Sequence, residues 1–395
     1  MSKKTPQIRF KGFTDDWEER KLGDISYKVK EKNKTGEFTE TLTNSAEYGI
    51  INQRDFFDKD ISNAKNLTGY YVVKNDDFVY NPRISNFAPV GPIKRNKLGR
   101  TGVMSPLYYV FRTHDIDKNY FEKYFDTVYW HRFMELNGDS GARADRFAIK
   151  DSVFVEMPIP YPTMDEQQKI GLFFKQLDDT IALHQRKLDL LKEQKKGYLQ
   201  KMFPKNGAKV PELRFAGFAD DWEERKVKDI FKITRGQVLA ATETSEEKSD
   251  ISPFPVYSSQ TKNNGLMGYY KDYLFDTAIT WTTDGANAGT VSYRSGRFYS
   301  TNVNGVLISD KGYTNKAISE ILNLEAWKWV SHVGNPKLMN NVMGDISIMI
   351  PRSFEEHDRL SDFLNQLDDT IALHQRKLDL LKEQKKGFLQ KMFVS

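Results

Sequence analysis

Two segments of this 395-residue chain occur twice, and this repetition constrains the fold more than any other feature. The first segment, 6–25, returns at 211–230 with 14 of 20 positions identical, including the run DDWEERK. The second segment, 176–203, returns at 366–393 with one difference in 28 positions. A chain that repeats both segments so closely is built from two similar halves.

The sequence between the repeated segments differs in the two halves. The inserts at 26–155 and 231–347 share no evident similarity and have different lengths. Because the flanking segments are preserved while the inserts diverge, the pattern indicates a common scaffold that holds two different binding regions.

The second repeated segment and the residues before it predict two long helices. Each begins with a capping-box pattern, Thr163 to Glu166 and Ser353 to Glu356, in which the hydroxyl accepts from an amide and the Glu reaches back. Apolar residues then recur at a spacing of about 3.5, as in a coiled-coil seam. The seam residues are Ile170, Phe174, Leu177, Ile181, Leu188, Leu191, Leu360, Leu364, Leu367, Ile371, Leu378 and Leu381. Such a narrow stripe needs a partner, and antiparallel pairing of the two copies is the expected arrangement; the alternative is that each helix packs only on its own domain.

These patterns predict a mixed α/β (α+β) fold with a pseudo-twofold internal repeat. Two globular domains, 1–155 and 205–349, are joined by two long antiparallel helices in 156–204 and 350–395 that form a coiled-coil spacer.

Composition excludes several classes of protein. No run of about 18 apolar residues is present, and the first residues are polar, so we expect neither a membrane span nor a secretory signal, and a cytoplasmic location. The absence of cysteine excludes disulfides, thiolate zinc sites and a cysteine nucleophile. The net charge of +5, from 59 basic and 54 acidic residues, is too small to identify a nucleic-acid binder.

The first insert concentrates its positive charge in a loop-like segment. Residues 83–100 contain five basic residues, no acidic residue, and several Pro and Gly. Tyr80 precedes this segment at the end of a predicted strand, and a later Gly-rich loop adds two arginines. Basic loops supply phosphate contacts and base contacts in DNA-binding proteins, although a solvated surface loop has the same composition. The candidate residues are Tyr80, Arg83, Lys94, Arg95, Lys97, Arg100, Arg143 and Arg146.

The second insert offers a weaker set of candidates. It has amide-rich and hydroxyl-rich turns, of the kind that pair with base edges but that also occur as simple turns. Its basic residues in 285–309 likewise have no acidic neighbour in sequence. The candidates are Lys262, Asn263, Asn264, Arg294, Arg297 and Lys337.

Signatures of catalysis are missing from the sequence. Residues 81–84 (NPRI) match only half of an adenine-methyltransferase motif and are interpreted as a turn. The acidic pairs at 178–179 and 368–369 lie within the predicted helices, which favours solvent-facing or interface charges over metal ligands. Trp17 and Trp222 are interpreted as anchors that join each insert to the frame, which is the pair of repeated segments on either side of it. No catalytic, cofactor-binding or metal-binding residue is predicted.

With its duplicated P-x-[IL]-R-F-x-G-F-x-D-D-W-E opening, its duplicated QLDDTI helix and its two unlike inserts, the chain resembles the specificity subunits of type I restriction-modification systems. The likeness extends over the whole chain, and Ile-Pro precedes both helix starts. One departure is His357, where the first copy has Gln167.

The resemblance implies a non-catalytic DNA-binding subunit whose inserts are target-recognition domains, each reading one half of a bipartite double-stranded target. It implies helices that fix the gap and dock two modification subunits, which carry S-adenosylmethionine. It also implies restriction subunits that carry ATP and Mg²⁺, with no cofactor on this chain. Two alternatives from other classes are a scaffold whose inserts bind proteins and a self-sufficient methyltransferase with a divergent catalytic domain.

Overall fold

The computed structural model describes residues 5–56, 64–139, 145–205, 207–259 and 262–394. Contacts divide the chain into two compact units. The first unit comprises Met1–Gln185 with Lys377–Ser395, and the second comprises Arg186–Arg376. The predicted boundaries gave each long helix a segment of its own, whereas the contacts divide each helix between the units.

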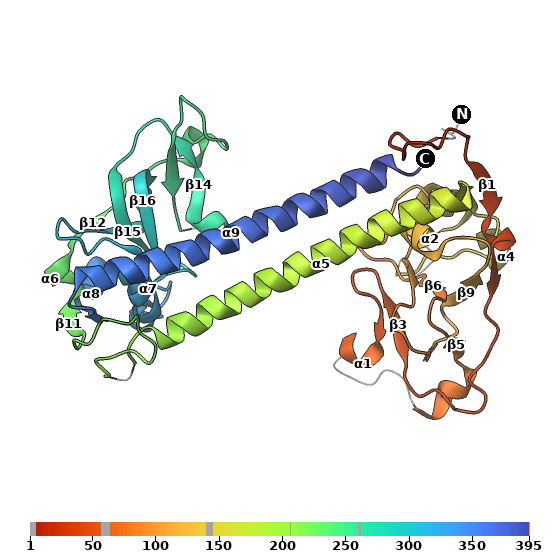
Figure 1. Ribbon diagram of the computed structural model, residues 1–395, viewed down its shortest axis with the longest axis horizontal. Helices are drawn as coiled ribbons and strands as arrows, with labels where there is room; N and C mark the ends of the chain where they lie inside the picture. The colour runs from red at the N-terminus through yellow and green to blue at the C-terminus, as the bar shows by residue number, and fades with distance from the viewer. Residues whose placement is uncertain (1–4, 57–63, 140–144, 206, 260–261, 395) are drawn as a thin grey trace. The chain divides into compact units, whose positions relative to one another are not determined.

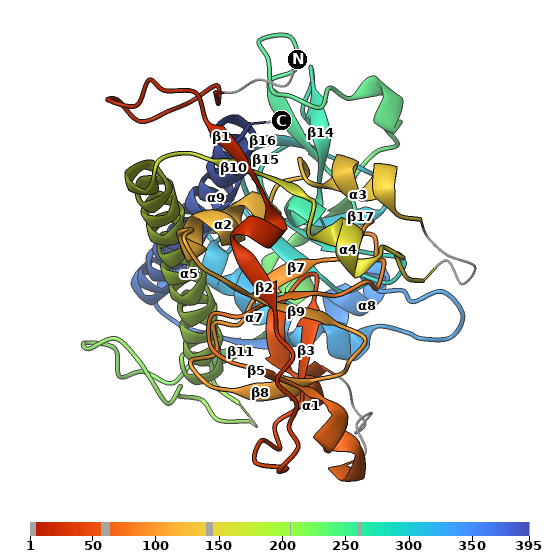
Figure 2. The ribbon, with the colours of Figure 1, turned by 90° about the vertical axis from the view of Figure 1, so that its right-hand side faces the viewer.

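An antiparallel ribbon connects each repeated opening segment to a long helix. In the first unit, β1 (Glu18–Lys21) pairs with β10 (Pro158–Tyr161), which directly precedes α5 (Met164–Lys201); Figure 2 shows β1 and β10 side by side. In the second unit, β11 (Glu223–Lys226) pairs with β18 (Ser347–Ile350), which precedes α9 (Phe354–Lys391). The duplicated segments therefore form the same ribbon and helix start in both units.

A backbone hydrogen bond also fixes each opening segment to the end of a long helix. In the first unit, the Ile8 amide donates to the carbonyl of Lys391, the last residue of α9, at 2.9 Å. In the second unit, the Leu213 amide donates to the carbonyl of Lys201, the last residue of α5, at 2.8 Å. Each opening segment thus contacts the start of one long helix through its ribbon and the end of the other through this bond.

The first insert forms a four-stranded sheet and two smaller antiparallel sheets of two strands each. The sheet has the order β2-β9-β6-β7 and is antiparallel throughout. Its strands are β2 (Ser26–Lys28), β6 (Phe78–Tyr80), β7 (Ile93–Arg95) and β9 (Tyr109–Thr113). The smaller pairs are β3 (Leu42–Ser45) with β4 (Gly49–Asn52) and β5 (Tyr71–Val73) with β8 (Gly102–Met104). The helices are α1 (Gln53–Phe56), α2 (Lys118–Phe125), α3 (His131–Asn137) and α4 (Asp151–Phe154), with 3₁₀ turns at Leu22–Asp24 and Ala64–Gly69.

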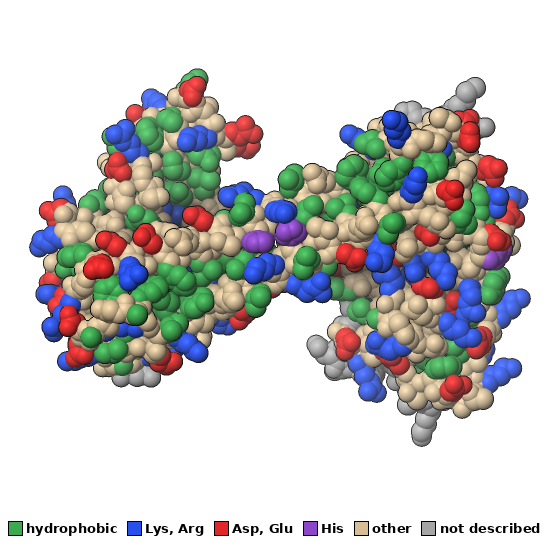
Figure 3. Space-filling view, viewed as in Figure 1, with side chains coloured by type: hydrophobic (Ala, Val, Ile, Leu, Met, Phe, Trp, Pro, Cys, Tyr) green, Lys and Arg blue, Asp and Glu red, His purple; other side chains and the backbone are tan. Residues whose placement is uncertain are grey.

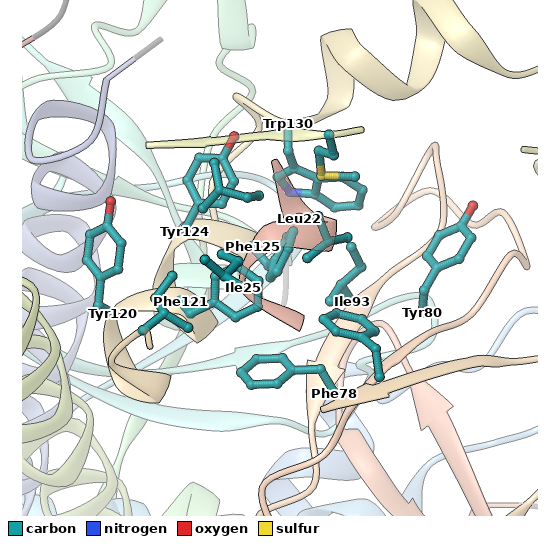
Figure 4. Packing of buried hydrophobic residues seen from close by; sticks show 14 of the residues in the cluster. Leu22, Ile25, Phe78, Tyr80, Ile93, Tyr120, Phe121, Tyr124, Phe125 and Trp130 are labelled. Atoms are coloured by element: carbon teal, nitrogen blue, oxygen red, sulfur yellow. The ribbon is translucent and has the colours of Figure 1, made fainter. Parts of the chain in front are cut away.

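Aromatic side chains fill the space between this sheet and its helices. Phe78 from β6 and Phe121 from α2 meet edge to face at 5.0 Å, and Trp130 is buried beside Phe125 (Figure 4). Helix α2 begins where the Asp117 carboxylate accepts from two backbone amides, as expected of an N-cap. Phe78 and Phe111 belong to this aromatic core, whereas Val79 and Val110, from the same strands, belong to a second buried cluster.

The second insert forms a different and larger sheet. Six strands lie in the order β12-β17-β15-β16-β13-β14, in which β13 and β16 are parallel. They are β12 (Lys232–Arg235), β13 (Phe254–Tyr257), β14 (Leu266–Tyr270), β15 (Phe275–Thr282), β16 (Val291–Ser300) and β17 (Asn304–Ile308). The helices are α6 (Val227–Ile230), α7 (Lys316–Glu325) and α8 (Asn340–Asp345), with 3₁₀ turns at Ala241–Glu243, Lys262–Gly265 and Ala326–Trp329. Trp281, Leu307 and Leu322 are among the residues of its buried core.

Segments of α5 and α9 run antiparallel inside each unit; Figure 1 labels both helices. In the first unit, Phe173 of α5 packs on Phe388 of α9 with ring centroids 5.1 Å apart. In the second unit, Tyr198 of α5 packs on Phe363 of α9 at 5.0 Å. All twelve predicted seam residues are buried or half-buried. The alternative in which each helix packs only on its own domain is wrong for these segments.

Two buried clamps hold the opening segments to the helix starts. In the first clamp, defined as Arg9, Trp17 and Glu166, the guanidinium donates to both carboxylate oxygens at 2.7 and 2.8 Å, and the indole N–H donates at 3.1 Å. The predicted capping box is correct for Thr163, whose hydroxyl accepts from the Glu166 amide at 3.4 Å. It is wrong for the Glu166 carboxylate, which binds Arg9 and Trp17 instead of reaching back to the helix start.

The second clamp, defined as Arg214, Trp222 and Glu356, repeats this geometry. Its guanidinium donates at 2.8 Å to each oxygen, and its indole donates at 3.3 Å. Both tryptophans are buried, which confirms their predicted role as anchors.

Candidate nucleic-acid interface

Most of the predicted basic segment 83–100 is neutralised inside the first unit. Four of its side chains contact carboxylates from other parts of the chain: Lys94 with Asp126 (3.0 Å), Arg95 with Asp76 (2.8 Å), Lys97 with Glu122 (2.7 Å) and Arg100 with Glu40 (2.7 Å). The segment is free of acids in sequence but not in space. Each of the four cations therefore already has an anionic partner, and its contact with DNA stays a prediction.

Two of these carboxylates, Asp126 and Glu40, have lowered pKa values. Burial alone would raise the pKa of Asp126, but Lys123 and Lys94 hold this pKa well below the usual range. The hydrogen bond from Arg100 lowers the pKa of Glu40 against a smaller opposing effect of burial. Both carboxylates are therefore ionised near pH 7.

Tyr80 belongs to the core of the first unit. Its side chain is 4% exposed, and its hydroxyl donates to the Val90 carbonyl at 2.9 Å. Figure 4 shows it at one side of the buried cluster, near Ile93. Burial raises the pKa of this phenol. Tyr80 also lines the groove of about 670 Å³ described below, and its contact with DNA stays a prediction.

Two candidate arginines of the first unit are exposed and form no described ion pair. Arg83 and Arg146 are joined by an isolated antiparallel bridge, and within the described ranges neither side chain forms an ion pair. The Asn81 side-chain oxygen accepts from the Arg83 amide at 3.0 Å, as in the turn predicted at 81–84. Arg143 lies outside the described residues. Arg83 and Arg146 therefore form the basic patch of this unit.

A groove of about 670 Å³ lies beside this basic patch. Pro82 and Phe147, the neighbours of the two arginines, line it together with Leu107, Tyr109 and Lys150, among others. The lining also contains Asp139 and Asp151. Apolar and aromatic walls with basic residues at the edge suit contact with nucleic acid. Sequence reasoning missed the groove because its walls come from five separate stretches of the chain that carry no shared local signal.

The candidates of the second unit are dispersed over its loops and strands. Arg297 is exposed on β16, 3.7 Å from Asp276, and Lys337 lies 3.8 Å from Asp284, so both are loosely paired. Asn263 and Asn264 are exposed with left-handed backbones, at φ 51° and 53°. For Lys262 only the backbone is described.

Arg294 differs from the other described candidates of the second unit because it is buried within the sheet. Its residue is 6% exposed, its Nε donates to Thr280 Oγ1 at 3.2 Å, and its guanidinium lies 3.8 Å from the centre of the Tyr257 ring. Burial lowers its pKa, and Tyr257 opposes this effect. The prediction placed Arg294 with Arg297 in one surface region, but the alternation of β16 directs Arg294 inward.

The acidic pairs of the helices were predicted to be solvent-facing or interface charges; Asp179 and Asp369 are exposed, and Asp178 and Asp368 contact lysines of other elements. Asp178 accepts from Lys123 of α2 and from Lys385 of α9, at 2.8 and 2.7 Å. Its copy, Asp368, is bound in the same way by lysines of α5 and α7. Among the residues described, no cluster of three or more His, Asp or Glu is suited to a metal ion.

Figure 3 shows basic and acidic side chains interspersed over the visible face of each unit, which agrees with this pairing. A search of the described helices finds none with the length and apolarity needed to span a bilayer.

The fold and these surfaces define a protein in which one duplicated frame carries two unlike sheets with basic and amide-rich surfaces. The chain belongs to the family described as type I restriction modification DNA specificity domain, whose model matches residues 14–193 and 219–383. The resemblance seen in the sequence is confirmed.

Relatives agree with this family. A Mycoplasma pneumoniae protein provisionally named type I specificity subunit S.MpnORF201P is 34% identical over 218 residues, covering 53% of this chain and 82% of its own length. The type I restriction enzyme MpnII specificity subunit of the same organism is 37% identical over 146 residues, covering 36% of this chain and 43% of its own.

The fold has a counterpart among solved structures. The crystal structure of the type I restriction-modification system S subunit from M. genitalium matches with a TM-score of 0.67 at 14% identity, over 98% of this chain and 99% of that one.

Membership of this family makes the chain a DNA-specificity subunit of a restriction-modification system, which acts with modification and restriction partners. The catalytic activity of such systems belongs to the partner subunits, so this chain is not an enzyme. The alternative of a self-sufficient methyltransferase is therefore wrong, and a scaffold that binds only proteins does not fit a DNA-specificity family.

Proposed function

We propose that each unit reads one half of a bipartite double-stranded DNA target. The observation that supports this most is that the same clamp and ribbon hold a four-stranded sheet in one unit and a six-stranded sheet in the other. A preserved frame with unlike sheets is what two readers of different sequences require. Phosphate contacts by basic side chains would position each sheet, and loop side chains would read the bases.

In this proposal, α5 and α9 form a coiled-coil spacer related by a pseudo-twofold axis, and the spacer sets the gap between the half-sites. A helix of 38 residues is about 57 Å long at about 1.5 Å per residue. That length equals the rise of roughly 17 base pairs of B-DNA at 3.4 Å each, and overlap with the sheets shortens the usable span.

The helices would also dock two modification subunits, because they carry matched exposed leucines. In the first unit, Leu183 and Leu380 are 60% and 58% exposed; in the second, Leu373 and Leu190 are 59% and 52% exposed. Leu183 and Leu373 occupy equivalent positions of the repeat, as do Leu190 and Leu380. S-adenosylmethionine would be bound by these modification subunits, and ATP and Mg²⁺ by restriction subunits.

Sequencing of methylated DNA from cells that express the chain with its partners tests the bipartite target. We expect one motif made of two half-sites separated by a fixed gap. The double variant Arg83→Gln/Arg146→Gln should relax only the half-site of the first unit, whereas Lys232→Gln, at an exposed lysine of the second unit, serves as the control. Equal relaxation of both half-sites, or a motif without a gap, would contradict the proposal.

The gap can be tested by shortening both helices together. Deletion of 184–190 and of its copy 374–380 removes one heptad from each helix and keeps the seam in phase. Seven residues correspond to about 10 Å, so the gap should shorten by about 3 base pairs with unchanged half-sites. An unchanged gap would show that the helices do not set it.

Docking can be tested by counting modification subunits in the purified complex by native mass spectrometry. The variant Leu183→Glu/Leu373→Glu should lose both subunits, and the variant Glu193→Gln/Glu383→Gln, at exposed positions of the same helices, should keep both. Retention of both subunits in the leucine variant would place the docking surface elsewhere.

A further inference from the structure

A small polar pocket of the second unit has Arg294 at its base. The pocket holds about 140 Å³ and is formed by strands β15, β16 and β17 and the segment that follows β13. Apart from Arg294 and Gly265, its walls are hydroxyl and amide side chains: Ser258, Ser259, Asn264, Thr280, Thr282, Asn287, Thr290, Ser292 and Asn304. Arg294 is the one charged residue in this lining.

The Arg294 guanidinium has no anionic partner among the residues that the structure describes. Its contacts are the Thr280 hydroxyl at 3.2 Å and the face of the Tyr257 ring. A guanidinium has five N–H donors, and the Nε contact uses one of them. Its burial exceeds nine-tenths, and Arg294 is one of the residues that line the pocket.

Other buried cations of the molecule are paired with carboxylates. The Lys123 side chain is 6% exposed and contacts Asp126 and Asp178 at 2.8 Å each. The Lys316 side chain is 16% exposed and contacts Glu320 and Asp368. An isolated charge in a protein interior costs several kcal/mol, which is why buried charges are paired. Arg294 departs from this rule, and its position at an open polar pocket indicates that its counter-charge is supplied from outside.

We propose that this pocket binds one phosphate group, with Arg294 as the charged ligand and the surrounding hydroxyls and amides as hydrogen-bond donors. A volume of about 140 Å³ holds roughly five water-sized groups at about 30 Å³ each, which matches the size of a phosphate group. Arginine binds phosphate oxygens through paired N–H donors, and serine and threonine hydroxyls complete such sites.

The phosphate has two possible sources, the DNA backbone and a free phosphate-class anion. The DNA source rests on the proposed function, since it requires that the second unit contact a half-site. The anion site itself does not depend on DNA recognition.

Isothermal titration of the full chain with inorganic phosphate, at ionic strength held constant with chloride, tests the site. The unaltered chain should bind one phosphate per chain. Arg294→Gln should weaken this binding by about 10- to 100-fold, as expected for loss of hydrogen bonds to a charged group. Arg294→Lys should retain part of it, and Lys232→Gln should bind like the unaltered chain.

Thermal unfolding separates this role from a purely structural one. Without phosphate, Arg294→Gln should unfold at the same temperature as the unaltered chain or higher, because a buried unpaired charge has been removed. Phosphate should raise the unfolding temperature of the unaltered chain and leave that of Arg294→Gln unchanged. Absence of saturable phosphate binding, or equal binding by Arg294→Gln, would overturn the proposal whether or not the chain reads bipartite DNA.

The source is identified with the complex of the chain and its modification subunits. If the DNA backbone supplies the phosphate, Arg294→Gln should weaken duplex binding about tenfold, and one methylphosphonate in the second half-site should have the same effect on the unaltered complex only. If a free anion supplies the phosphate, the unaltered chain should still bind inorganic phosphate. Duplex binding should then be insensitive both to Arg294→Gln and to the methylphosphonate. Loss of bipartite recognition together with intact phosphate binding would contradict the proposed function and leave the anion site supported.

Discussion

The two units hold their frames in the same way but treat their basic residues differently. The clamps agree to within a few tenths of an ångström, at 2.7–3.1 Å in the first unit and 2.8–3.3 Å in the second. In the first insert, however, the basic segment is neutralised by carboxylates, whereas in the second Arg294 is buried without a described anionic partner. The two copies therefore hold their inserts to the repeated segments in the same way. The inserts themselves differ in which basic side chains lack a carboxylate partner.

The largest expected effect is loss of a clamp. Glu166→Ala leaves a guanidinium and an indole N–H unpaired in the interior, and should lower the free energy of unfolding by about 3–5 kcal/mol. Because the second clamp has the same geometry, Glu356→Ala should have an effect within about 1 kcal/mol of this value in chemical denaturation of the full chain. Glu18→Ala, at an exposed position, is the control. A large difference between the two clamps would break the equivalence of the frames.

A second comparison concerns the helix aspartates. Burial raises the pKa values of Asp178 and Asp368, but their lysine partners lower them below the ordinary carboxyl value. Since a depressed carboxyl pKa stabilises the fold above the unfolded pKa of about 3.9, this stabilisation is present at pH 7 and is lost as the pH falls through the folded pKa.

Asp178→Asn and Asp368→Asn should each lower stability by about 2 kcal/mol at pH 7 and reduce the acid-dependent loss below about pH 4. The measurement is the free energy of unfolding as a function of pH, with Asp179→Asn, an exposed neighbour, as the control. An unchanged acid dependence in both variants would show that the lysine contacts do not stabilise the units.

The third prediction separates paired from unpaired cations in the first unit. Arg83→Gln/Arg146→Gln should weaken DNA binding by the complex about tenfold and reduce the salt dependence, since each lost phosphate contact lowers the slope by about 0.9. Arg100→Gln should change DNA binding less than about twofold, because Arg100 is already bound to Glu40. Equal effects of both changes would mean that the ion pair opens on DNA.

The smallest effect is expected at Tyr80. Tyr80→Phe removes its hydrogen bond to the Val90 carbonyl and should cost about 1 kcal/mol of stability. DNA binding should be unchanged when measured below the unfolding transition. A selective loss of DNA affinity would support the prediction that Tyr80 contacts the ligand.

The frame could be predicted from the sequence because its signals are local or repeated. Heptad spacing identified the buried face of both helices, and the repeated DDWEERK run identified Trp17 and Trp222 as anchors. The role of Glu166 was missed, because its partner Arg9 lies 157 positions away, and a capping box is the nearest local interpretation.

The candidate interface was less predictable because its contacts, like that of Glu166, join residues far apart in sequence. The carboxylates that neutralise the segment 83–100 lie up to 60 positions from their partners, so no window of sequence shows the pairing. The burial of Tyr80 and Arg294 could not be predicted, because it is decided by which face of a strand meets the core. That choice depends on the whole sheet, and the unlike inserts offered no second copy for comparison.

The hydrogen bonds from Ile8 to Lys391 and from Leu213 to Lys201 give the fold a cyclic topology. In the second unit, residues 202–212 join the end of one helix to the next opening segment, whereas the equivalent positions in the first unit are held together without a peptide connection. A linker of the same length from Lys391 to Ile8, with the chain opened between 204 and 210, would give a circular permutant with all of these contacts available. The order of the two halves along the gene is therefore not a requirement of the fold.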